Sequence, residues 1–169
     1  MADPRTLGPL IHVTAEAIGI PGRRRFRIKG MAADGTHICL WLEKEQLIAL
    51  GDAIQTVLND EGYEHRTIPL DDMELDPVYP LDAEVELRLG QLSMGMDRDA
   101  RLIVLIAAGV SEENEPLNVS VTFAYRRGFD LRMTINSVVA SGRPPCPLCT
   151  APMDAGHVCP RKNGHHAQE

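Results

Sequence analysis

No stretch of this 169-residue sequence is apolar for long enough to cross a membrane, because none approaches the roughly 20 residues that a spanning helix needs. A secretory signal is also missing. The first residues, Met1-Ala2-Asp3-Pro4, lack the basic start and the apolar segment of a signal peptide. These two absences predict a cytoplasmic protein with no membrane contact.

Local catalytic signatures are absent as well. The sequence has no Gly-x-Ser-x-Gly, no glycine-rich phosphate loop and no His-Glu-x-x-His. His12, His37 and His65 are isolated, so we expect them to be strand or surface residues. Since the members of a catalytic triad need not be close in sequence, an enzyme is not excluded.

Cysteine is scarce and unevenly placed. One of the four, Cys39, lies alone in a predicted strand, where it is expected to act as a small buried residue. The other three fall between residues 146 and 159. In a chain without an export signal, such a cluster beside histidines favours a metal site over disulfides.

The pattern at this cluster suits zinc, which prefers four thiolate or imidazole ligands in a tetrahedron. Cys146 and Cys149 form a Cys-x2-Cys pair, whose tight turn can point both sulfurs in the same direction. Cys159 supplies a third sulfur, and His157 precedes it by two residues, behind a glycine. We therefore expect Cys146, Cys149, His157 and Cys159 to hold one structural zinc ion.

Other interpretations of the cluster remain. The fourth ligand could be His165 or His166 in place of His157, although these lie on a tail that we expect to be frayed. The Cys-x2-Cys pair could also be a redox dithiol. That motif normally opens a helix near a βαβ unit, whereas prolines here disfavour a long helix. The cysteines could, finally, have neither role.

Charge is also uneven. The net charge is −7, yet residues 60–99 carry 3 basic and 12 acidic side chains, a net of −9. A middle region this acidic repels phosphate backbones, so nucleic acid is an unlikely partner for the whole protein.

Hydrophobic periodicity predicts an α+β domain. Strands are expected over 10–13, 25–29 and 36–42, followed by an amphipathic helix over 43–60 with Leu47, Leu50, Ile54 and Val57 inward. Gly62 can end this helix in a left-handed cap. Three further strands are expected over 84–96, 102–108 and 117–125, and then a second helix from Asp130 to Ser141.

Two details and an overall arrangement follow from these segments. The apolar positions change phase between Leu89 and Leu92, which predicts a bulge at Gly90-Gln91. Short connections predict a mainly antiparallel sheet in βββα–βββα order with both helices on one face. We expect residues 1–141 to form this domain and residues 142–169 to form a zinc-knuckle-like extension.

The C-terminal residues resemble the signature of a known family. Two stretches carry the resemblance: Gly142-Arg143-Pro144-Pro145-Cys146-Pro147-Leu148-Cys149 and Gly156-His157-Val158-Cys159-Pro160-Arg161-Lys162-Asn163-Gly164. Together they are similar to the signature of an uncharacterised family of actinobacteria and Chloroflexi, a conserved domain of unknown function. That family usually has glycine where this chain has Thr150, and a more regular helix rich in alanine and arginine before the signature. The resemblance implies no activity.

Three functions are compatible with these observations. The first is a non-enzymatic binding or adaptor protein with a protein partner, which the closed set of ligands and the missing catalytic motifs favour. The second is nucleic-acid binding by the knuckle, whose tail has basic residues but no aromatic for base stacking. The third is an enzyme that uses the Cys146–Cys149 dithiol or a zinc-bound water.

Overall fold

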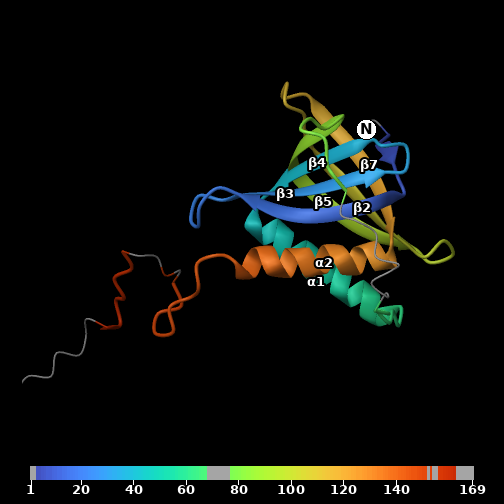
Figure 1. Cartoon of the computed structure of the whole chain (residues 1–169). Coiled ribbons are helices and arrows are strands. Elements are labelled where there is room, and N and C mark those ends of the chain that lie inside the picture. The colour runs from blue at the N-terminus through green and yellow to red at the C-terminus, as the bar shows by residue number, and fades with distance from the viewer. Residues whose placement is uncertain (1–2, 68–76, 152, 154–155, 163–169) are drawn as a thin grey trace, which may run out of the picture.

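The computed structural model describes residues 3–67, 77–151, 153 and 156–162, and these form one sheet and two helices (Figure 1). In chain order the elements are β1 (Arg5–Leu7), β2 (Leu10–Ile18), β3 (Arg25–Ala32), β4 (His37–Leu42), α1 (Lys44–Asp60), β5 (Val85–Asp97), β6 (Leu102–Val110), β7 (Pro116–Ala124) and α2 (Tyr125–Ala140).

The strands form a single mixed sheet in the order β1-β7-β6-β5-β4-β3-β2. The antiparallel pairing within β2-β3-β4 and within β5-β6-β7 agrees with the prediction. Two pairings, β4 with β5 and β1 with β7, are parallel, so the sheet is mainly antiparallel, as expected, but mixed. The first arises because α1 lies between two adjacent strands, and such a crossover makes its strands parallel. The second involves β1, which the sequence did not predict.

Both helices lie on the same side of the sheet, as expected, and they enclose one hydrophobic core (Figure 1). The four residues of α1 that were predicted to face inward, Leu47, Leu50, Ile54 and Val57, are all buried. Gly51 brings the helices together, since a Cβ at this position would lie 3.1 Å from the Ile135 side chain of α2. Gly62 follows α1 with a φ of +62°, as the predicted left-handed cap requires.

The predicted bulge in β5 is confirmed. The register with β6 shifts between Leu89 and Gln91, so that one extra residue separates the two halves of the strand. Leu92, Met94 and Met96 consequently pack against the core, on the same face as Leu89. The bulge thus keeps one apolar face along the whole of this long strand.

Helix α2 begins earlier than predicted. It starts at Tyr125, directly after β7, and Asp130 is not its N-cap but an internal residue that pairs with Arg127 at 3.4 Å. The early start depends on Gly128, where a Cβ would lie only 2.5 Å from Ile103 of β6. Leu131 and Ile135 are buried as predicted, and the end of the helix leads directly to the C-terminal cysteines. In the described part of the chain, no helix has both the length and the apolar character needed to cross a membrane.

Candidate metal centre

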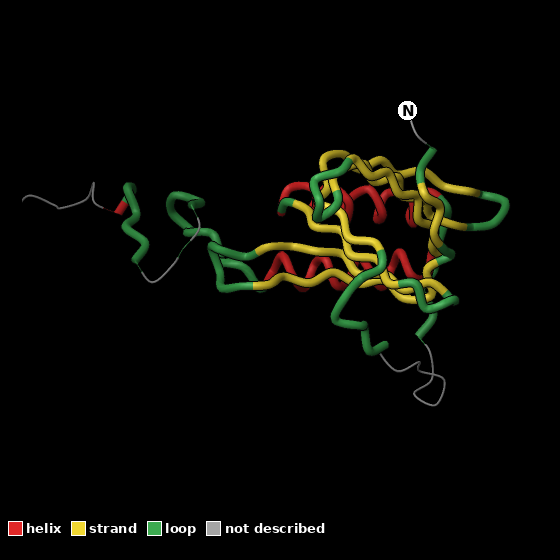
Figure 2. Tube along the Cα trace, turned by 90° about the horizontal axis from the view of Figure 1, so that it is seen from above, coloured by secondary structure: helices red, strands yellow, loops and turns green. Residues whose placement is uncertain are grey.

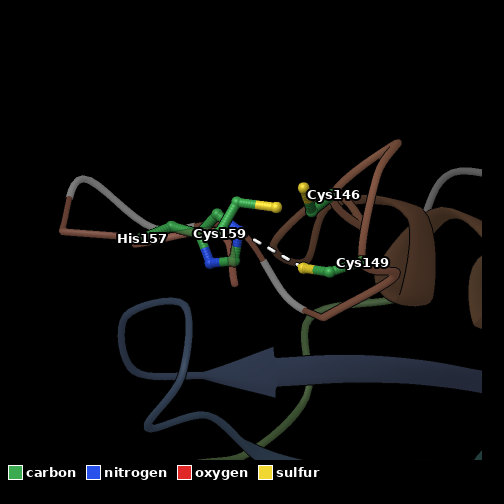
Figure 3. A group of neighbouring side chains, drawn as sticks. All are labelled: Cys146, Cys149, His157 and Cys159. Atoms are coloured by element: carbon green, nitrogen blue, oxygen red, sulfur yellow. Dashed lines mark hydrogen bonds between the residues drawn. The ribbon is translucent and has the colours of Figure 1, made fainter. Parts of the chain in front are cut away.

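The structure brings the four predicted ligands together beyond the end of α2 (Figure 3). Cys146, Cys149, His157 and Cys159 each offer one ligand atom, and these atoms all lie within 4.8 Å of one another. Cys146 and Cys159 are buried, while Cys149 and His157 are half-buried. His165 and His166, the alternative fourth ligands, lie outside the described residues.

A tight hairpin positions the first two sulfurs. The Cys146 amide donates to the Ala151 carbonyl, and the Thr150 amide donates back to the Cys146 carbonyl, both at 2.8 Å. Thr150, which follows the second cysteine, has a φ of +62°. This left-handed conformation suits glycine, and it strains a β-branched threonine.

Arg161 ties the second half of the site to the first. Its guanidinium donates to the Leu148 carbonyl, between the two hairpin cysteines, at 2.7 Å. A turn holds the chain locally, because the Lys162 amide donates to the Cys159 carbonyl at 3.1 Å. This role of Arg161 was not predicted, and the one signal for it in the sequence is its position two residues after Cys159.

Backbone amides favour negative charge at Cys146. The amides of Cys149 and Leu148 donate to its sulfur and, with a smaller contribution from His157, lower the pKa of this thiol to about 6. At Cys149 the Ala151 amide acts in the same direction, but burial and the neighbouring sulfurs of Cys146 and Cys159 outweigh it and raise the pKa. The site therefore favours negative charge at Cys146 over Cys149, and a bound cation would offset the repulsion between these two sulfurs.

The donor set and its spacing fit zinc. Three sulfurs and one imidazole are ligands that zinc prefers, whereas magnesium and calcium prefer oxygen. The sulfur of Cys149 lies 3.5 Å from Nε2 of His157 (dashed in Figure 3). In a tetrahedral site with Zn–S of about 2.3 Å and Zn–N of about 2.0–2.1 Å, that edge would be about 3.5 Å. Four such donors leave no position for a water molecule or substrate.

Cys39 is not part of this cluster. It lies in β4 and is only 3% exposed. Burial raises the pKa of its thiol to about 11, with a further contribution from Glu86. It behaves as the small buried strand residue that the sequence predicted, and such a thiol is a poor nucleophile.

A cavity in the domain lies apart from the cysteines. It has a volume of about 560 Å³ and lies between β2 and α2, where His12, Arg126 and Asp130 are among its lining residues. No cysteine or serine lines it among the described residues. His65 stacks on Phe129 at 4.0 Å, and His37 is buried beside the Asp82 carbonyl. The three isolated histidines therefore lie in different surroundings and form no common site.

A family model described as "Protein of unknown function (DUF3090)" matches residues 7–159. The chain belongs to this family. The match confirms the family resemblance stated from the sequence, and it extends from β1 to the last cysteine of the cluster. The description of the family assigns no activity, and no curated protein matches the chain.

Proposed function

We propose that this member of the DUF3090 family is a non-enzymatic binding or adaptor protein, whose C-terminal segment is held by one structural zinc ion. Cys146, Cys149, His157 and Cys159 would be the ligands. The observation that supports this most directly is the convergence of four donor atoms within 4.8 Å, which leaves no open coordination position.

Zinc would replace a hydrophobic core in this segment. Between residue 142 and residue 162, the buried hydrophobic residues of the described chain are Cys146 and Cys159 themselves. A segment that buries so little apolar surface needs another source of stability, and a structural metal supplies it. We therefore propose residues 1–141 as the α+β domain and residues 142–169 as a zinc-dependent extension.

The extension exposes apolar side chains that suit a protein partner. Leu148 is 48% exposed and Val158 is 71% exposed, and they belong to the two halves of the site. Fixing both halves around one ion would fix these two side chains relative to each other. Proteins that the zinc-loaded chain retains but a Leu148→Ser/Val158→Ser variant does not retain would identify the partner.

The ligand assignment is tested by elemental analysis of untagged protein. We expect one zinc per chain, strongly reduced binding in Cys146→Ser and His157→Ala, and unchanged binding in a His165→Ala/His166→Ala control. Zinc should also be lost as the pH falls, because protons compete with the metal for the thiolates. If the His165→Ala/His166→Ala variant lost zinc while His157→Ala retained it, the fourth ligand would be His165 or His166.

The lowered pKa of Cys146 favours one second candidate, a redox dithiol formed with Cys149. The two proposals differ in the state of the purified protein. A chain that lacks zinc and forms a Cys146–Cys149 disulfide reversibly would support the dithiol. A chain with one bound zinc and thiols protected from alkylation would support the structural site.

A further inference from the structure

Basic side chains from separate parts of the chain converge where the domain meets the C-terminal segment. Arg24 and Arg25 come from the β2–β3 hairpin, Lys44 from the start of α1, Arg88 from β5, and Arg143 from the residues after α2. Figure 2 shows the hairpin tip beside the chain that leaves α2. The sequence does not reveal this cluster, because only two of its members, Arg24 and Arg25, are adjacent in the chain.

Contacts with the backbone fix the centre of this cluster. The guanidinium of Arg24 donates to the Val138 carbonyl and to the Ser141 hydroxyl, both at 3.0 Å, at the end of α2. It also lies 5.1 Å from the centre of the Phe26 ring. Arg143 lies against Gly22 of the hairpin, where a Cβ would come within 3.1 Å of its guanidinium. These contacts hold Arg24 and Arg143 in place at the centre of the cluster.

Two small cavities open among these side chains. The first, of about 180 Å³, is lined by Gly22, Arg24, Phe26, Lys44 and Arg143. The second, of about 160 Å³, shares Arg24 and Phe26 with the first, and its other lining residues are Arg25, Trp41, Leu42, Glu43, Arg88 and Leu89. Among the described residues that line these two cavities, Glu43 is the one with an acidic side chain.

Most of these cations have no carboxylate partner. The ion pairs of the described residues involve Arg27, Lys29, Arg98 and Arg127. Arg24, Arg25, Lys44 and Arg88 form none with the described part of the chain. Arg24 instead binds neutral oxygens, Arg25 lies 4.2 Å above the Trp41 ring, and Arg88 donates to the Asn114 amide oxygen. Arg25 and Arg88 also line a neighbouring cavity with Glu86 and Glu112, which reduces the positive potential around them. Arg24 and Lys44 therefore carry most of the positive charge that is left for an external anion.

We propose that this surface, formed by Arg24, Arg25, Lys44, Arg88 and Arg143, binds a small molecule that carries two neighbouring phosphate groups. Guanidinium groups match phosphate oxygens with paired hydrogen bonds, and each cavity has room for one phosphate. The two cavities meet at Arg24, which would contact both groups. A long polyanion is disfavoured, because it would extend over the rest of the protein surface, and the net charge of −7 would repel it. A small ligand stays at the basic surface, and salt screens it from acidic groups more than about 8 Å away.

The test is calorimetric titration of the full chain with inorganic pyrophosphate. Arg25→Gln/Lys44→Gln removes two cations that make no hydrogen bond to the backbone in the described structure. Arg5→Gln/Arg126→Gln is the matched control, since it changes the net charge equally but lies outside both cavities. Zinc content is measured before and after each titration, because pyrophosphate also binds metal ions.

Pyrophosphate should bind the native chain and the control equally, and the Arg25→Gln/Lys44→Gln variant about tenfold or more weakly, with unchanged zinc content. Equal binding by both double variants would overturn the proposal, as would no binding by the native chain. Orthophosphate that binds as tightly as pyrophosphate would contradict the second phosphate position. A single-stranded oligonucleotide that binds more tightly than pyrophosphate would make the surface a nucleic-acid site instead.

Discussion

At the scale of single residues, the members of the Cys/His cluster could be selected from the sequence, while backbone strain could not be predicted. Cys146, Cys149, His157 and Cys159 could be selected because few residue types bind zinc and their spacing permits tight turns. The positive φ of Thr150 depends on the path of the hairpin, which the residues around Thr150 do not specify. The link from Arg161 to Leu148 joins residues on opposite sides of a loop, and no local pattern encodes it.

Replacing Thr150 by glycine should strengthen the metal site. The left-handed conformation costs an ordinary residue about 1–2 kcal/mol, and glycine avoids this cost. Part of that gain is offset, because glycine loses more conformational entropy than threonine when the chain folds. A net gain of about 1 kcal/mol corresponds to about fivefold tighter zinc binding, measured by competition with a chelator.

Two further substitutions at this position separate strain from side-chain contacts. Thr150→Asn should also improve binding, since asparagine tolerates the left-handed region. Thr150→Val should not, because it keeps the β-branch and loses the hydroxyl that donates to the Cys149 carbonyl at 2.6 Å. Tighter binding by the valine variant would show that strain at Thr150 is unimportant.

At the scale of elements, periodicity predicted the segments that have many residues and one apolar face. Helix α1 and the bulged strand β5 are of this kind, and both were correct. Strand β1 has three residues, too few to show alternation, and its partner β7 lies more than a hundred residues away. The start of α2 was wrong because Asp130 resembled a cap, whereas close packing at Gly128 allows the helix to begin directly after the strand.

The bulge in β5 depends on a glycine in the strand beside it. Gly109 lies opposite Leu89, and a Cβ at this position would lie 2.0 Å from the Arg88 carbonyl oxygen. We expect Gly109→Ala to lower the free energy of unfolding by about 2 kcal/mol or more, measured by denaturant titration. Gly95→Ala, in β5, is the control, because a Cβ there meets no atom within 4 Å. Equal effects of the two substitutions would show that the bulge tolerates a side chain.

At the scale of the whole molecule, the apolar core and the cysteine cluster are separate. The core residues lie in the sheet and the two helices, and none of them follows Ile135 except the partly buried Val138 and Val139. Composition could predict this division, since the alternating segments end before Gly142. How the pieces meet could not be predicted, because the contacts of Arg24 with Val138 and Ser141 join residues more than a hundred positions apart.

Truncation after Ser141 should leave a domain that folds. The shortened chain keeps all seven strands and both helices, as well as the acceptors of Arg24. We expect a single cooperative thermal transition at a temperature equal to or slightly below that of the full chain, and no zinc binding. A truncated chain without a transition would show that the C-terminal segment is part of the core.

The parallel pairing of β1 with β7 affects how the chain can fold while it is being made. Arg5 emerges early from a ribosome, but its neighbour Val119 is synthesised more than a hundred residues later. The hairpins β2–β3 and β3–β4 involve nearby residues and can form during translation, whereas β1 has to wait for β7. A nascent chain that stops before β7 therefore lacks the partner of its first strand, and it exposes the edge of β6 to pairing with other chains.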